Sequence, residues 1–197
     1  MRIKHCFQGA LCVAAFLIIS SGAAIGQASP AGHTRPELAA SFDYVRSNAP
    51  VGGCGCFGIY GGNATFALPL HDSPLALVAE AASGVSTNIA PGGYNLLLSR
   101  FTAGIRYTPY LATSRLHPFA QITGGVAHAS QSLVASATVS NAPATLALNL
   151  GGGIDLDLNR RFSVRLAQAN YLLTTFNNGS NNLQNNLRLD AGIVVHF

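Results

Sequence analysis

The sequence predicts an all-β protein in which eight antiparallel strands run up and down in chain order and close into a barrel that spans a membrane. Three observations lead to this fold class. The last eleven residues, Leu187 to Phe197, alternate apolar and polar side chains, which indicates a strand with one face of each kind. Charged residues make up 9% of the chain, against about 25% in typical soluble domains. The seven connections between the expected strands alternate between long and short, as they do in membrane-spanning barrels.

The chain is expected to have three parts. They are a signal peptide (residues 1–26), a short periplasmic lead-in (27–36) and the barrel (37–197). The signal peptide has a basic start and then an apolar run, residues 10–19, which is too short to span a bilayer as a helix. Cleavage is expected after Ala24-Ile25-Gly26, with cleavage after Ala28 or an uncleaved anchor as alternatives.

Removal of the signal peptide leaves nine arginines, seven acidic residues and no lysine. Such a weak positive balance gives no reason to propose a nucleic acid as a partner.

The expected strands are separated by segments rich in turn-forming residues. Their bounds are Glu37–Arg46, Phe57–Leu68, Leu75–Gly84, Leu96–Thr108, Arg115–Ala129, Ala144–Leu158, Arg161–Leu173 and Leu187–Phe197. In the seventh strand the alternation breaks at Gln168-Ala169-Asn170, which indicates a β-bulge or the approach to the membrane rim.

Charged residues decide between a membrane barrel and a soluble barrel or sandwich, because a soluble barrel would show similar strands. Eight charged residues fall on the parity opposite the large apolar ones: Asp43, Glu80, Arg100, Arg106, Asp155, Arg165, Arg188 and Asp190. A soluble barrel would hold its large apolar side chains inside and scatter charges outside. The sequence therefore predicts apolar side chains toward lipid and a polar lumen in which the four arginines pair with the four acids.

Several segments resemble those of the small eight-stranded bacterial outer-membrane barrels of the OmpA/OmpX type, the outer membrane protein β-barrel domain family. The segments are Glu37-Leu38-Ala39-Ala40-Ser41-Phe42-Asp43-Tyr44, His117-Pro118-Phe119-Ala120, Gly151-Gly152-Gly153-Ile154-Asp155, Asn185-Asn186-Leu187-Arg188-Leu189 and the terminal Phe197. The resemblance covers the whole expected mature chain.

The resemblance implies a monomer in the cell outer membrane, surrounded by outer-membrane lipid and lipopolysaccharide. It further implies delivery by periplasmic chaperones and recognition of the aromatic last strand by the barrel-assembly machinery. The chain stops at that strand, so no C-terminal peptidoglycan-binding domain is expected.

Two functions without chemistry fit such a barrel. An eight-stranded barrel is only wide enough for its own side chains, so the first is a structural or surface-interaction protein with a plugged, charge-paired lumen. The second is a narrow pore that opens when the lumen ion pairs switch partners. The narrow width of an eight-stranded barrel favours the first function. No residue in the sequence favours a gate over a plug.

A third, less favoured function is that of a lipid A-modifying hydrolase. His128-Ala129-Ser130 places a histidine and a serine on the same, lipid-facing side of the fifth strand. Lipid A deacylase barrels use a similar His-x-Ser pair with a downstream glutamate that orients the histidine. Here no glutamate follows Glu80, so we predict that the protein is not an enzyme and has no catalytic residues.

No cofactor or metal site is predicted either. Cys54 and Cys56 have no histidine nearby, and His33, His71, His117 and His196 are scattered along the chain. Gly151-Gly152-Gly153 lies within a strand and indicates close packing rather than a nucleotide-binding loop.

Overall fold

The computed structural model describes residues 35–48, 56–71, 73–89, 93–110, 115–131, 144–176 and 182–197. Eight strands account for nearly all of them: β1 (Glu37–Asn48), β2 (Cys56–Pro69), β3 (Leu75–Ile89), β4 (Tyr94–Tyr107), β5 (Leu116–Gln131), β6 (Thr145–Asp157), β7 (Phe162–Thr174) and β8 (Gln184–His196). Within the described ranges there is no helix long and apolar enough to cross a membrane. The predicted signal peptide, residues 1–26, lies outside these ranges.

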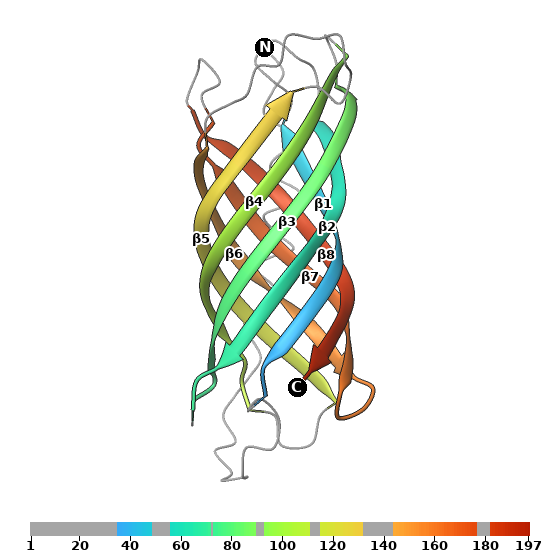
Figure 1. Cartoon of the computed structure of the whole chain (residues 1–197), viewed down its shortest axis with the longest axis vertical. Coiled ribbons are helices and arrows are strands. Elements are labelled where there is room, and N and C mark those ends of the chain that lie inside the picture. The colour runs from blue at the N-terminus through green and yellow to red at the C-terminus, as the bar shows by residue number, and fades with distance from the viewer. Residues whose placement is uncertain are drawn as a thin grey trace, which may run out of the picture.

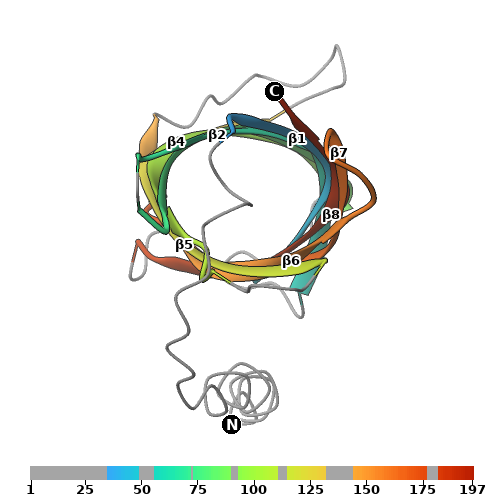
Figure 2. The ribbon, with the colours of Figure 1, turned by 90° about the horizontal axis from the view of Figure 1, so that it is seen from below.

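The strands form one closed antiparallel barrel in chain order, as predicted (Figure 1). Closure is made by β1 and β8, which pair from Glu37 opposite His196 to Arg46 opposite Leu187. Seen along its axis, the barrel is a complete ring of tilted strands (Figure 2). The start of β1 and the end of β8 lie at the same end of it, where Phe197 N donates to Pro36 O at 3.0 Å. We call this the periplasmic end, because both termini of outer-membrane barrels lie there.

Most strand bounds agree with the predicted ones to within three residues, but the expected loop 85–95 is wrong. β3 continues to Ile89 and β4 begins at Tyr94, with an irregular register between Ser86 and Ile89 and a positive φ of 57° at Asn88. The segment contains serine, threonine and asparagine, which resemble a loop in composition. Backbone pairing with β4 nevertheless extends the hairpin, because pairing does not require the apolar alternation of a lipid-facing strand.

The predicted break in β7 is a β-bulge, and it lies slightly earlier than the sequence indicated. Arg165 pairs with Asp155, whereas Ala167 pairs with Ile154, so Leu166 is the extra residue. Leu166 and Ala167 both lie on the exposed outer side. The bulge therefore shifts the inward parity, and Arg165 and Gln168 both reach the lumen.

The outer surface of the barrel is apolar over most of its height. Its most exposed side chains include large ones such as Phe101 (62%), Leu150 (60%) and Phe42 (58%). Near the end opposite the termini an aromatic cluster forms, in which the Tyr60 ring lies 5.1 Å from Tyr44 and 6.5 Å from Phe42. Bulky apolar side chains on the outside and charges on the inside are the arrangement of a barrel in lipid, and this part of the prediction is confirmed.

Inward-facing glycines allow neighbouring strands to approach, and one neighbouring pair offers a test. A Cβ atom at Gly61 would overlap the backbone oxygen of Ser83 in β3, whereas one at Gly62 would lie 3.5 Å from the nearest atom, Ser41 O. We expect Gly61→Ala to lower the free energy of unfolding by about 1–3 kcal/mol, because a backbone atom cannot move aside as a side chain can. Gly62→Ala should change it little. Unfolding of both variants refolded in lipid vesicles checks this, and equal values would contradict it.

Candidate functional site

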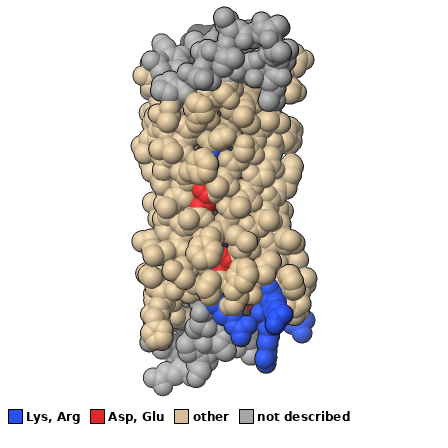
Figure 3. Space-filling view, viewed as in Figure 1, with Lys and Arg blue, Asp and Glu red and all other residues tan. Residues whose placement is uncertain are grey.

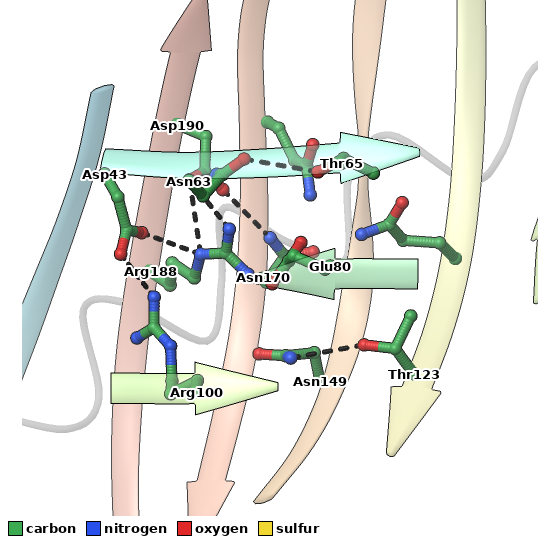
Figure 4. A network of polar contacts seen from close by, with 12 residues as sticks. Asp43, Asn63, Thr65, Glu80, Arg100, Thr123, Asn149, Asn170, Arg188 and Asp190 are labelled. Atoms are coloured by element: carbon green, nitrogen blue, oxygen red, sulfur yellow. Dashed lines mark hydrogen bonds and ion pairs between the residues drawn. The ribbon is translucent and has the colours of Figure 1, made fainter. Parts of the chain in front are cut away.

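A network of charged and amide side chains lies in the middle of the lumen, centred on Arg188 (Figure 4). Arg188 is fully buried and bridges three strands. Its Nε donates to Asp43 Oδ1 at 2.7 Å, its Nη2 donates to Asp190 Oδ1 at 3.0 Å, and its Nη1 forms an ion pair with Glu80. Arg100 binds the second oxygen of Asp43. We call these five residues the central layer.

Amide side chains complete the central layer from strands that contribute no charge to it. Asn63 Nδ2 in β2 donates to Asp190 Oδ1 at 2.6 Å, and Asn170 Nδ2 in β7 donates to Asp190 Oδ2 at 3.2 Å. Three carboxyl groups thus face two guanidinium groups, and neutral donors bind the carboxyl group of Asp190. Such donors stabilise a buried carboxylate that has too few cations around it.

A second charged layer lies nearer the periplasmic end. Arg165 binds Asp155 through two parallel hydrogen bonds of 2.9 Å, and Arg106 binds Glu37 at 3.1 Å. Both arginines lie over the ring of Phe119, with their Cζ atoms 4.3 Å (Arg106) and 4.7 Å (Arg165) from its centre. Cation–π contact therefore holds two like charges side by side in this layer.

The sequence predicted these arginines and acids as lumen residues, and the structure pairs every one of the eight. The partner that the prediction missed is Glu37, the first residue of β1. Its signal was available, because Glu37 shares the inward parity of Asp43. Which arginine meets which acid could not be read from the sequence, since the pairs join strands that are far apart in the chain.

The predicted polar lumen does not extend to the end opposite the termini. There a buried apolar cluster fills the interior, made by Val45, Ile59, Leu98, Ala127, Ala147 and Leu172. Phe57, Leu96, Ala129 and Phe176 pack against it. We call this cluster the apolar layer. Contact among these apolar side chains is favourable because it removes apolar surface from water. An eight-stranded barrel is narrow enough for side chains from several strands to meet.

The periplasmic mouth of the lumen brings together two histidines that lie far apart in the sequence, His117 and His196. His117 Nε2 lies 2.9 Å from Asp157 Oδ2, and Ser163 Oγ lies 2.7 Å from His196 Nε2. Ser163 Oγ also donates to Asp157 Oδ1 at 2.5 Å. The tilt of the strands, rather than any motif, makes these four residues neighbours.

A serine beside a histidine suggests a nucleophile, but the geometry here is that of a structural network. The hydroxyl proton of Ser163 is donated to Asp157, so His196 does not accept it, and Glu37 Oε1 is 3.8 Å from His196 Nδ1, too far for a hydrogen bond. Ser163 is only 1% exposed. A nucleophile must reach its substrate, and this hydroxyl does not.

His128 and Ser130 both lie in β5 on its outer side, as predicted. Among the described residues no carboxylate binds His128, and no hydrogen bond joins it to Ser130. A histidine that nothing orients is a weak general base. Of the two cysteines, Cys56 begins β2 and is half-buried, whereas Cys54 lies outside the described ranges. No group of three or more potential metal ligands occurs within the described ranges.

Solved structures with a similar architecture include those of two bacterial proteins. Neisserial surface protein A (NspA) aligns with a TM-score of 0.62 and 15% sequence identity, over 82% of this chain and 97% of NspA. The fold is that of the small outer-membrane β-barrels. Ail, the attachment invasion locus protein of Yersinia pestis, aligns with this barrel with a TM-score of 0.53 and 13% identity, over 82% of the chain and 98% of Ail. No protein-family model and no curated protein sequence matches the chain.

At such low identity the likeness concerns the fold alone, and it confirms the predicted fold class and the resemblance to small outer-membrane barrels. Ail is an outer membrane protein, and the apolar outer surface of this barrel agrees with the same location. The likeness to NspA and Ail therefore assigns no role to the residues of the central layer.

Proposed function

We propose that the protein is an integral barrel of the outer membrane with a structural or surface-interaction role and a plugged lumen. The observation that carries the proposal is the position of Arg188, which binds Asp43, Glu80 and Asp190 from β1, β3 and β8 at once. β8 and β3 are three strands apart around the ring, so the contacts of Arg188 cross part of the lumen, and this supports a plugged interior. The apolar layer above it and the Arg106–Phe119–Arg165 stack below it support the same conclusion.

A surface-interaction role is proposed by analogy of fold. Ail is named as an attachment invasion locus protein, and one of its solved structures is a complex with the heparin analogue sucrose octasulfate. In this proposal the partners are outer-membrane lipid and lipopolysaccharide around a monomer, together with the periplasmic chaperones and assembly machinery that insert it. An enzymatic function receives no support from His128 or Ser130, for the reasons given above.

Conductance across a planar lipid bilayer tests the plugged lumen. We expect the refolded protein to insert without producing persistent current steps, because three successive layers of side chains project into an interior that is narrow in an eight-stranded barrel. Gel migration of unheated and heated portions of the same sample is compared to verify that the barrel has formed. A lack of current steps then cannot result from a lack of folded barrel. Steps that recur in every preparation would instead establish the alternative, a gated pore. A change in those steps in Arg188→Met would then place the gate in the central layer.

A further inference from the structure

The exposed arginines of the barrel are gathered at one end. Of the nine arginines in the described residues, four are paired in the lumen and one, Arg46, is exposed near the opposite end. The other four are exposed at the periplasmic end: Arg35, Arg115, Arg160 and Arg161. We call these four the periplasmic arginine patch. In Figure 3 the basic side chains form a continuous area at the lower end of the barrel, below a surface that shows only small spots of charge.

The patch is continuous because its members sit on neighbouring strand ends. Arg115 O accepts from Asp157 N at 2.8 Å, Arg161 O accepts from His196 N at 2.8 Å, and Arg35 Nη1 donates to Arg160 O at 3.4 Å. The ends of β5, β6, β7 and β8 and the start of β1 are therefore joined side by side. Together they carry four positive charges along one side of the rim.

The turn that carries two of these arginines is held in one conformation. Asn159 Oδ1 accepts from the backbone nitrogens of Arg161 at 2.8 Å and Phe162 at 3.0 Å. Such a side-chain-to-backbone turn is a common way to fix a tight connection. Arg160 and Arg161 are thus presented side by side from a fixed backbone rather than from a long loop.

No ion pair neutralises the patch among the described residues. Asp157 and Glu37, two acids at the same end of the barrel, are bound to His117, Ser163 and Arg106 at the mouth of the lumen. Within the part of the chain that the structure describes, the four guanidinium groups can therefore bind an external anion. Planar guanidinium groups match the oxygens of a phosphate through paired hydrogen bonds, and they do so better than ammonium groups.

Large exposed apolar side chains lie close to the patch, three of them within two residues of a patch arginine in the chain and one, Phe197, through its backbone bond to Pro36. They are Leu116, Leu158, Phe162 and Phe197, each more than 40% exposed. An apolar surface that ends at a row of cations matches a lipid molecule, whose acyl chains meet apolar side chains while its phosphate meets arginine. Lipopolysaccharide lies in the opposite leaflet, so the matching lipids at this end are the phospholipids of the inner leaflet.

We propose that the periplasmic arginine patch binds the phosphate groups of anionic phospholipids in the inner leaflet of the outer membrane. This inference rests on the proposed membrane location. It gives the barrel a lipid preference at one rim that its apolar belt alone would not produce. The recognised chemistry is a phosphate in a lipid headgroup, held at the height of the β6–β7 turn.

The test uses the protein refolded into nanodiscs that contain equal amounts of phosphatidylglycerol and phosphatidylcholine with identical acyl chains. Native mass spectrometry then measures which lipids remain bound to the released protein. We expect phosphatidylglycerol to be enriched, and we expect Arg161→Gln to reduce its enrichment about fivefold, the contribution of one basic residue near an anionic surface. Arg160→Gln/Arg161→Gln should reduce it further. Arg46→Gln, which removes an exposed arginine from the other end, is the matched control and should retain the enrichment.

Several results would overturn the proposal. They are absence of enrichment in the original protein, enrichment that survives Arg160→Gln/Arg161→Gln, and an equal loss in Arg46→Gln. Arg115→Gln provides a second variant on a different strand end if the turn variants fail to insert. Addition of inorganic phosphate separates the two sources of the anion. Loss of bound phosphatidylglycerol at millimolar phosphate would show a site for free phosphate instead. Gel migration of unheated samples reports insertion separately, so failure of the membrane location is distinguishable from failure of lipid binding.

Discussion

Arg188→Met is expected to lower the free energy of unfolding by about 3–5 kcal/mol, the cost of removing one partner from a buried ion pair. Arg188 is fully buried and contacts all three carboxyl groups of the central layer. Without it, Asp43, Glu80 and Asp190 face only the guanidinium group of Arg100. Methionine fills a similar volume, so the effect comes from charge rather than from a cavity.

Denaturant unfolding of the refolded protein in lipid vesicles measures this effect. Arg46→Met is the matched control, because it makes the same substitution at an exposed arginine and should leave stability unchanged within error. Arg188→Met combined with Glu80→Gln and Asp190→Asn should recover part of the loss, since the carboxylates left without a partner are then neutral. Equal stability of Arg188→Met and the original protein would show that the central layer does not hold the barrel together.

Ile193→Arg is expected to lower the free energy of unfolding by about 2–4 kcal/mol, the cost of a basic residue at mid-depth on the lipid face of a barrel. Ile193 is 56% exposed on the outer side of β8. It lies midway between Leu189, which pairs with Tyr44 of the aromatic cluster, and Phe197 at the periplasmic end. Arginine there would be surrounded by acyl chains on all open sides.

The same substitution nearer the rim of the same strand provides the control. Leu187 pairs with Arg46, so a natural arginine already lies at this height on the outer surface. Leu187→Arg should therefore cost only about 0–1 kcal/mol. Unfolding in lipid vesicles compares the two variants. If Leu187→Arg were as damaging as Ile193→Arg, the apolar belt would not lie where the structure places it.

The lumen and the lipid face differ in how far the sequence could predict them. The outer row of β8, from Leu187 through Ile193 to Phe197, could be recognised from alternation alone, and the structure exposes it. The outer positions of His128 and Ser130 followed in the same way. Alternation depends only on the local geometry of a strand, in which successive side chains point to opposite faces. No knowledge of neighbouring strands is needed for that step.

The expected loop 85–95 and the extent of the polar lumen were predicted wrongly because both depend on contacts between strands. The extension of β3 to Ile89 depends on pairing with β4, which proceeds through polar residues that alternation treats as a loop. The apolar layer depends on six strands that each send one small or branched side chain to the same height. In a single strand, Val45 or Leu172 is an apolar residue at an inward position where the alternation predicts a polar one. Only the closed barrel shows that these residues contact one another.

The eight strands, their lipid-facing sides and all charged residues of the two lumen layers except Glu37 could be predicted from the sequence. Four features could be seen only in the folded barrel: the partners of those charges, the contact of Phe119 with two arginines, the contact of Ser163 with His196, and the position of four arginines at one rim. The physical reason is strand tilt. Tilt and stagger in a closed barrel bring residues from different strands to one height, and that height is a property of the whole ring rather than of any one strand.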